Sequence, residues 1–353
     1  MRVLFLQQQP CVRALKYAVA LRARCPKIRL GFVFRGQTLS ELYGTGDDLF
    51  ERWWRLDGDD AAELRQAVRE FRPDVIHSHN LPDSLTVLAQ ELADGCVPVV
   101  HDVHDLQSLR QTPYEDGFPE PPAPLELERL AVEGSAGLVT VSDELLAEIE
   151  ARYQRPPTAL VFPNLALGRD LPAQLPAPDR PRNGRLRLVY QGTLAVNDGH
   201  YDLRTLFASI TAANVKLDVY PNRGLKDYRG LGVRLHRKLA PVDLLAALPR
   251  YDLGWAGFNA VLNGAHLDTA LPNKVFEYLG CGLPVLALRH KALARLLERH
   301  GVGVVLDDLD DLGAQLADID LPALRRRVAE ARLEFTVESR IDDVADLYEE
   351  VAS

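Results

Sequence analysis

Short apolar segments alternate with helical patterns through the first half of the chain. The predicted strands occupy 2–6, 28–34, 74–79, 97–101 and 137–142, and helical patterns cover 11–24, 60–71 and 82–93 among others. Alternation of strand and helix predicts βαβ units, because parallel strands need a crossover between them. We therefore expect a parallel sheet that helices cover on both faces.

A proline-rich stretch at 163–184 interrupts this alternation and indicates a break between two domains. Beyond it the strand pattern restarts, with apolar segments at 186–192, 215–220, 233–236, 252–258, 284–288 and 302–306. The pattern predicts a first domain, a linker, a second domain and a terminal helical segment over 1–168, 169–184, 185–336 and 337–353. The expected fold class is α/β, with two Rossmann-like, doubly wound domains that face a central cleft. Ligands of such sheets bind beyond the carboxyl ends of the strands.

The composition agrees with two folded domains and indicates the cellular compartment in which the protein works. The chain has 353 residues, of which 47% are hydrophobic, so it can bury two cores of ordinary size. Its four cysteines are scattered without a CxxC pair, which argues for a reducing compartment and against a structural zinc. No apolar run approaches ~18 residues, and no signal-peptide pattern opens the chain. We expect a cytoplasmic protein.

The charge is negative overall but uneven along the chain. The net charge of -9 makes bulk nucleic-acid binding an unfavourable hypothesis. Residues 1–40 nevertheless contain only basic charged groups, namely Arg2, Arg13, Lys16, Arg22, Arg24, Lys27, Arg29 and Arg35. A basic first element could make peripheral contact with an anionic membrane surface or an acidic acceptor. A solvated helix face is the alternative.

The segment 272–288, PNKVFEYLGCGLPVLAL, combines a short predicted helix with a strand. Lys274 falls in the first turn of that helix, where a positive charge opposes the helix dipole. The conflict disappears if an anion such as a phosphate binds there, because free N–H groups and the lysine would share it. Glu277 lies one turn deeper, roughly 5 Å along the axis, at the spacing between a diphosphate and its ribose. An ordinary Lys–Glu pair on a helix is the alternative.

These residues carry a resemblance to a known family. The segment LPNKVFEYLGCGLPVLA resembles the donor-binding segment of retaining glycosyltransferases of the GT-B fold, in the large family numbered four. Further stretches agree in order along the chain: DVIHSHN at 74–80, VPVVHDVHDL at 97–106, VTVSDELLAEI at 139–149, VFPN at 161–164 and LRLVYQGTL at 186–194. Enzymes of this family have an acceptor domain first and a nucleotide-sugar domain second. Their last helix returns to the first domain, which would account for residues 337–353.

The resemblance implies the activity and the site. The chain would move a sugar from a nucleotide-diphosphate sugar to an acceptor hydroxyl with retention of configuration, without a further cofactor or a metal. Glu277 would hold the donor ribose, and His104 would lie beside the transferring bond and act with Lys274 as the catalytic pair. The donor would be bound by Gly192, Thr193, Arg223, Asn273, Lys274 and Glu277. The acceptor would meet Gln8, His79 and Asp105.

Two departures from the family pattern concern the diphosphate and the ribose. The family often has an arginine and a lysine just after the glycine that matches Gly192, whereas the loop here reads GTLAVNDGH and contains Asp198. Lys274 and Arg223 would have to compensate. The acid that precedes the ribose-binding glutamate in the family matches Thr269, and the adjacent Asp268 could replace it.

Two other classes of function stay open from the sequence. His77, His79, His101 and His104 lie on neighbouring predicted strands and could form the metal site of a hydrolase. In HDVHD, however, the strand period sends His101 to one face and Asp102 and His104 to the other. A GT-B-like binding protein without turnover is the second alternative, favoured by the missing basic pair after Gly192.

Overall fold

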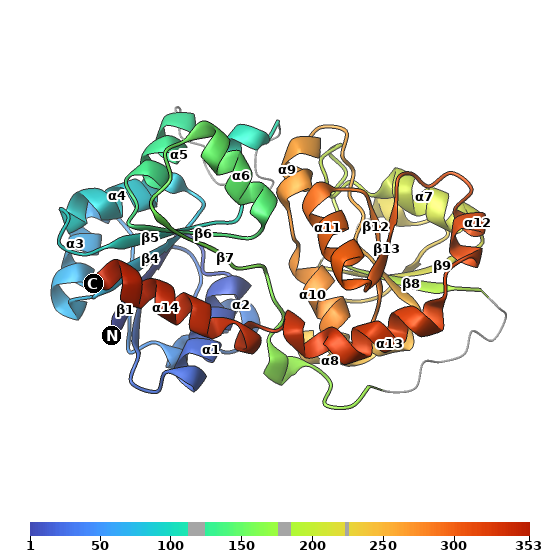
Figure 1. Ribbon diagram of the computed structural model, residues 1–353, viewed down its shortest axis with the longest axis horizontal. Coiled ribbons are helices and arrows are strands. Elements are labelled where there is room, and N and C mark those ends of the chain that lie inside the picture. Colours follow the sequence, from blue (N-terminus) through green and yellow to red (C-terminus); the bar gives the residue numbers. More distant parts are fainter. Residues whose placement is uncertain (112–123, 176–184, 223–225) are drawn as a thin grey trace. The chain divides into compact units, whose positions relative to one another are not determined.

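The computed structural model describes residues 1–111, 124–175, 185–222 and 226–353 and divides into two compact units (Figure 1). The first unit contains Met1–Leu109, Pro113–Pro163 and Val337–Ser353, and the second contains Arg110–Thr112 and Asn164–Thr336. The two units are α/β domains of Rossmann-like type, each with a parallel sheet.

The division between the units lies after Pro163, before the predicted boundary at residue 168. The reason is visible in the first residues after it. Asn164 donates its side-chain amide to the carbonyl of Leu271 at 3.0 Å, and Ala166 pairs with Thr336 in an isolated bridge. These contacts attach the segment to the second unit. The predicted linker over 169–184 lies outside the described residues from 176 onward.

The described strands of the first unit form a seven-stranded parallel sheet in the order β3-β2-β1-β4-β5-β6-β7. The strands are β1 Arg2–Gln7, β2 Arg29–Phe34, β3 Arg52–Arg55, β4 Val75–His79, β5 Val99–Val103, β6 Gly137–Thr140 and β7 Thr158–Val161. The register sets His79 against Asp102 and His77 against Val100 on the neighbouring strands. Because the strands are parallel, their carboxyl ends meet at one edge of the sheet, where Gln7, His79 and Val103 end β1, β4 and β5.

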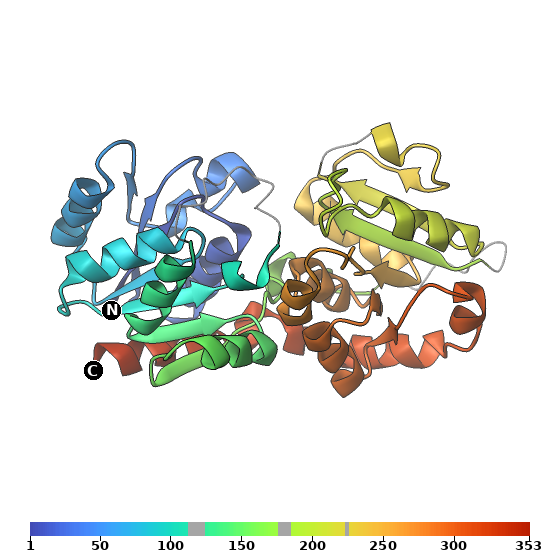
Figure 2. The same cartoon turned by 90° about the horizontal axis from the view of Figure 1, so that it is seen from above.

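Helices connect these strands. They are α1 Val12–Arg24, α2 Leu39–Tyr43, α3 Asp60–Phe71, α4 Asp83–Ala93, α5 Pro124–Glu133, α6 Asp143–Arg152 and α14 Ile341–Ala352. Local chemistry fixes several starts: the side chains of Asp59 and Ser142 cap α3 and α6 by accepting backbone N–H bonds. The last helix, α14, packs beside β7 and α1 of the first unit (Figure 1 and Figure 2).

The described strands of the second unit form a six-stranded parallel sheet in the order β10-β9-β8-β11-β12-β13. The strands are β8 Arg187–Gly192, β9 Lys216–Pro221, β10 Arg234–Leu235, β11 Leu253–Trp255, β12 Val285–Leu288 and β13 Gly303–Leu306. The helices are α7 Arg204–Ala212, α8 Pro241–Ala247, α9 Gly264–Thr269, α10 Asn273–Gly280, α11 Lys291–His300, α12 Leu312–Ala317 and α13 Leu321–Ala331.

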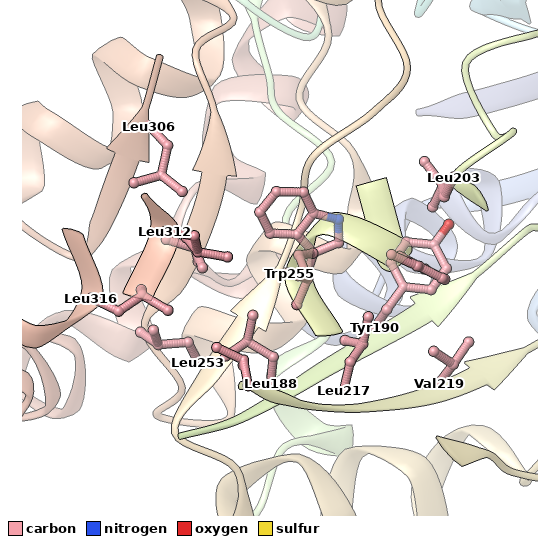
Figure 3. Close-up of a cluster of buried hydrophobic side chains, with 14 of the residues drawn as sticks. Leu188, Tyr190, Leu203, Leu217, Val219, Leu253, Trp255, Leu306, Leu312 and Leu316 are labelled. Atoms are coloured by element: carbon pink, nitrogen blue, oxygen red, sulfur yellow. The ribbon is translucent and has the colours of Figure 1, made fainter. Parts of the chain in front are cut away.

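A continuous apolar cluster packs on the sheet of the second unit (Figure 3). Trp255 lies at its centre and is fully buried together with Leu188 and Leu253 of neighbouring strands. Leu312 and Leu316 of α12 cover the cluster at one side, as Figure 3 shows. Fully burying such side chains stabilises the fold by about 1.5–3 kcal/mol each, which holds the strand ends of this sheet in place.

The basic N-terminal residues do not form a free positive surface. Most of them have partners inside the first unit: Arg13 with Asp102, Arg24 with Asp342, Arg29 with Glu51, Arg35 with Asp60, and Arg2 and Arg22 with backbone carbonyls. Lys16 is buried. The expectation of a membrane-facing basic element is therefore not supported, because four of these charges pair with acids within the fold. In the part of the chain that the structure describes, no helix has the length and apolar character needed to cross a bilayer.

Candidate functional site

Lys274 is a buried charged residue of the second unit. It lies in the first turn of α10, which has no side-chain cap and no acidic residue in that turn. Its side chain is buried, and its ammonium nitrogen has no hydrogen-bond partner among the described residues. Instead Nζ lies over three aromatic rings, 4.1 Å from the ring centre of Tyr190, 4.8 Å from Phe258 and 6.0 Å from Tyr201. Cation–π attraction of this kind compensates only part of the lost hydration.

Burial changes the titration of this lysine. Loss of hydration lowers the pKa of Lys274 from 10.5 to about 7, and the nearby Glu277 carboxylate opposes the shift only in part. A buried ammonium without a counter-charge is costly, and a bound anion would restore its charged form. Lys274 therefore fits the anion-binding role that its sequence position predicts.

The end of β8 meets Lys274. Gly192 has φ of +128°, and a Cβ atom there would lie 3.4 Å from the Lys274 ammonium. The backbone conformation favours glycine here, because side chains disfavour this φ, while the contact with Lys274 is of ordinary van der Waals length. Thr193 follows, with its carbonyl accepting from the Tyr190 hydroxyl at 2.6 Å and its Oγ1 accepting from Asn222 at 3.3 Å. The strand end is thus held close to the lysine.

Glu277 lies one turn further along α10 and is half-buried. Its carboxylate accepts a hydrogen bond from the side-chain amide of Gln191. The backbone N–H of Gln191 in turn donates to the hydroxyl of Tyr278 at 3.0 Å. Gln191 was not predicted as a site residue. Its position as the penultimate residue of a predicted strand, at the carboxyl edge, is the signal that could have found it.

The remaining donor-side predictions have mixed outcomes. Asn273 opens α10 beside Lys274, as expected. Arg223 lies outside the described residues. Asp198 is largely exposed and 3.9 Å from Arg204, so an arginine partly balances its charge. Asp268 accepts from the backbone N–H of Lys291 at the start of α11 and pairs with the side chain of the same lysine at 3.1 Å.

A buried carboxylate, Asp102, is the centre of the polar cluster in the first unit. Arg13 donates Nε to it at 2.9 Å, and His77 Nε2 lies 3.3 Å away. His79 Nδ1 and His104 Nε2 approach at 3.6 Å and 3.5 Å. Only His104 is partly accessible, with 18% of its side chain exposed. The strand register predicts this convergence of β4 and β5, and the alternation of HDVHD predicts that Asp102 and His104 share a face.

Electrostatics fix the protonation states in this cluster. Burial alone would raise the pKa of Asp102, but the adjacent Arg13 guanidinium and the hydrogen bond with His77 hold it well below its usual value. Burial lowers the pKa of His77, His79 and His104. At neutral pH the cluster therefore contains an ionised carboxylate, a guanidinium and neutral imidazoles.

The four-histidine metal site of the hydrolase alternative does not assemble. His101 points to the opposite face of the sheet, where its ring contacts Thr86 at 3.0 Å and Asp83 at 3.4 Å. His77, His79 and Asp102 do place one donor atom each within 4.8 Å of one another. Because Arg13 already neutralises the carboxylate, a divalent cation there would leave excess positive charge in a buried place.

The predicted acceptor residues lie at the carboxyl edge of the first sheet. Gln8 follows β1 and Asp105 follows β5, and both are half-buried. His79 is fully buried beneath this edge, with its ring centre 5.8 Å from that of His104. A direct contact between His79 and an acceptor would require the ring to be uncovered, so we reassign it to a supporting position.

Asn80 is a residue that the sequence reasoning missed. Its side-chain oxygen accepts the backbone N–H of His104 at 3.0 Å, and its amide donates to the carbonyl of Asp105 at 2.6 Å. One side chain after β4 therefore fixes the backbone turn after β5. A polar residue directly after a predicted strand is the signal that could have found Asn80.

Comparison with known proteins defines the class. A model described as a glycosyl transferase 4-like domain matches residues 6–164, and one described as glycosyl transferase-like matches residues 201–346. Together with the two Rossmann-like domains, these matches assign the chain to the glycosyltransferases of the GT-B fold.

Solved structures of similar fold span the whole chain. Sucrose-phosphate synthase from Thermosynechococcus elongatus aligns with a TM-score of 0.68 at 13% identity, covering 99% of this chain and 98% of that one. Anabaena HepE in complex with UDP aligns with a TM-score of 0.69 at 17% identity, covering 99% and 100%. UDP-GlcNAc 2-epimerase from Neisseria meningitidis, bound to UDP-GlcNAc, aligns with a TM-score of 0.60 at 12% identity, covering 99% and 100%. No curated protein matches the chain significantly in sequence.

Proposed function

We propose that the protein transfers a sugar from a nucleoside-diphosphate sugar to an acceptor hydroxyl with retention of configuration, as in glycosyltransferase family four. The observation that carries the proposal is the buried ammonium of Lys274, which lies at the start of α10 and has no hydrogen-bond partner in the described parts of the chain. A diphosphate would supply the negative charge that Glu277 provides only in part, and unpaired N–H groups at a helix start favour the same anion.

The donor would bind along α10 and the end of β8. Its diphosphate would lie against Lys274 and the backbone of Gly192 and Thr193, with Asn273 beside it. Glu277 would accept hydrogen bonds from the ribose hydroxyls, and Gln191 would hold that carboxylate in place. These groups bind and orient the donor and stabilise the charge that develops on the leaving diphosphate. No other cofactor is needed in this scheme.

The acceptor would bind at the carboxyl edge of the first sheet. His104 is the partly accessible imidazole there, and Gln8 and Asp105 flank it on neighbouring strand ends. A neutral imidazole can accept or donate one hydrogen bond to a sugar hydroxyl at the transferring bond. We expect His104 to contribute chiefly in the transition state.

UDP is the first nucleotide to test, because two of the structural neighbours, HepE and the epimerase, were crystallised with uridine nucleotides. A thermal-shift screen of UDP, GDP, dTDP, ADP and CMP would identify the base. Incubation of the matching nucleotide sugar with candidate hydroxyl acceptors should then release nucleoside diphosphate, and NMR of the product should show the donor's anomeric configuration. An inverted product would contradict retention while leaving transfer intact.

Two alternatives have their own outcomes in the same assay. Since the fold is shared with an epimerase, the donor is also incubated alone, and conversion to an epimer would replace the transferase proposal. Loss of turnover after extensive chelation, with its return on adding zinc, would favour a metal site at His77, His79 and Asp102. Tight nucleotide binding without turnover of any tested sugar would favour a binding protein.

His104→Ala tests the role of the first unit. We predict that kcat falls by about a hundredfold, the lower end of what loss of one transition-state hydrogen bond costs. Nucleotide affinity should stay within a few-fold, because the donor groups lie elsewhere in the chain. Steady-state kinetics and calorimetric titration of UDP check both parts. Normal turnover in the folded variant would show that the reacting groups lie on another strand.

A further inference from the structure

A chain of hydrogen bonds leads from the last helix to Asp102 inside the first unit. Tyr348 of α14 is fully buried, and its hydroxyl lies 2.5 Å from Nδ1 of His77. Nε2 of the same ring lies 3.3 Å from Asp102. The role assigned to His104 in transfer does not use these residues, although they are all buried and polar.

The direction of each bond follows from the charge on Asp102. Arg13 donates to both carboxylate oxygens, at 3.2 Å and 2.9 Å, and its remaining nitrogens donate to the carbonyls of Phe162 and Pro163. An ionised carboxylate can only accept, so His77 must carry its proton on Nε2. A neutral His77 then has a lone pair on Nδ1, and the Tyr348 hydroxyl must be the donor.

The Asp102 carboxylate also influences which ring nitrogen of His104 carries the proton. Asp102 Oδ1 lies 3.5 Å from His104 Nε2, which is longer than a hydrogen bond but close enough to favour a proton on that nitrogen. Nε2 is buried, whereas the ring as a whole is partly accessible. With the proton on Nε2, Nδ1 is left as a hydrogen-bond acceptor. Asn80 meanwhile holds the His104 backbone.

We propose that Asp102 is a positioning residue that fixes the tautomer and orientation of His104, and that Tyr348 fixes Asp102 through His77. His104 then presents Nδ1 as an acceptor for a substrate hydroxyl. The kinetic part of this inference rests on the proposed function, but the tautomers do not. No proton is transferred within the network. Its effect is to orient the side chains.

The tautomers of His77 and His104 can be measured directly in the ligand-free protein. Long-range 1H–15N correlation spectra of histidine-labelled protein distinguish Nε2–H from Nδ1–H rings, and His77→Gln and His104→Gln variants assign the signals. We expect both His77 and His104 to be neutral with the proton on Nε2 at pH 7. A proton on Nδ1 of either ring would overturn the inference whether or not the protein transfers sugar.

Tyr348→Phe tests the connection to activity with the smallest change. It removes only the hydroxyl, and we expect kcat to fall about threefold to tenfold, the range that one hydrogen bond commonly contributes, with unchanged UDP affinity. The matched control is Tyr153→Phe, which removes a half-buried hydroxyl bonded to Glu128 at 2.6 Å in the same unit. The control should keep the wild-type kcat. An equal loss in both variants, or no loss in Tyr348→Phe, would contradict a positioning role.

Asp102→Asn gives a second, stronger test. An asparagine amide can donate as well as accept, so it would allow His104 or His77 to move its proton to Nδ1. We expect the His104 spectrum to show that change together with a lower kcat. If the variant fails to fold because Arg13 loses its partner, Tyr348→Phe and the wild-type tautomers still decide the question. A folded Asp102→Asn protein with wild-type tautomers and kcat would overturn the inference.

Discussion

A buried lysine whose charge is balanced only in part costs stability, and Lys274, with Glu277 as its nearby opposite charge, is such a residue. Its aromatic neighbours Tyr190 and Phe258 stabilise the cation only partly, as the lowered pKa shows. A bound anionic ligand would offset the free energy that burial of this ammonium costs. Lys274, which the sequence marks by its place in the first helical turn, is therefore also a residue whose positive charge the structure balances only in part.

The cost of Lys274 predicts a pH-dependent stability. Its folded pKa of about 7 lies below the unfolded value of 10.5, so between these values the unfolded state binds more protons and stability rises with pH. Lys274→Met removes this cost. We expect the variant to raise the melting temperature of the ligand-free protein at pH 6, and to raise it less at pH 9. A gain that is equal at both pH values would contradict the assignment of the charge.

Glu277 is the second single residue whose removal gives a clear prediction. If its carboxylate accepts the ribose hydroxyls, Glu277→Ala should raise the Kd of the nucleoside diphosphate about tenfold or more, since a charge-assisted hydrogen bond contributes ~1.5–3 kcal/mol. Calorimetric titration measures this. Glu298→Ala, which removes an exposed carboxylate on α11 paired with Arg289, is the control and should leave the Kd unchanged. Equal affinities in wild type and a folded Glu277→Ala protein would end the ribose assignment.

At the scale of elements, the position of α10 depends on its contact with β11. A Cβ atom at Gly254 would lie 2.3 Å from the ring of Tyr278, so the helix packs on the strand through a residue without a side chain. Tyr278 in turn accepts the backbone N–H of Gln191 at 3.0 Å. This contact fixes the distance between α10 and the end of β8, and with it the spacing of Glu277 and Gln191.

Gly254→Ala tests this packing. The added methyl group must displace the Tyr278 ring, and overpacking of this kind costs about 1–3 kcal/mol of stability. We expect a lower free energy of unfolding and weaker UDP binding, because α10 must move. Gly264→Ala is the matched control, since a Cβ atom at Gly264 would meet nothing within 4 Å. Chemical denaturation and UDP titration of the two variants provide the comparison, and identical behaviour would contradict the packing argument.

The elements themselves were largely predictable from the sequence. The apolar segments became the strands of two parallel sheets, because hydrophobic periodicity reports local burial directly. The shared face of Asp102 and His104 followed from strand alternation. Hydrogen bonds between distant residues were not predictable in this way. Asn80 with His104, and Tyr348 with His77, depend on side-chain geometry that a pattern does not contain.

At the scale of the whole molecule, charge was the poorest guide. The basic residues over 1–40 suggested contact with an anionic membrane surface or an acidic acceptor. Several of these arginines instead pair with acids that come later in the chain, such as Asp102 and Asp342. Asp268 likewise accepts the backbone N–H of Lys291, a residue that follows it by 23 positions. A count of charges along the sequence reports composition, while pairing is decided by the tertiary fold. The GT-B assignment depended on motifs spread over both domains, which are less sensitive to such pairing.

The central claim is that the second unit binds a nucleoside diphosphate through Lys274. Calorimetric titration of UDP and of uridine into wild type and Lys274→Met, at pH 8 in buffers of different ionisation enthalpy, tests it most directly. Because a lysine with a pKa of about 7 is mostly neutral at pH 8, UDP binding to wild type should take up about one proton. Lys274→Met should lose this uptake and bind UDP about tenfold or more weakly, while uridine affinity stays the same. Equal losses for UDP and uridine, with no proton uptake in wild type, would contradict the claim.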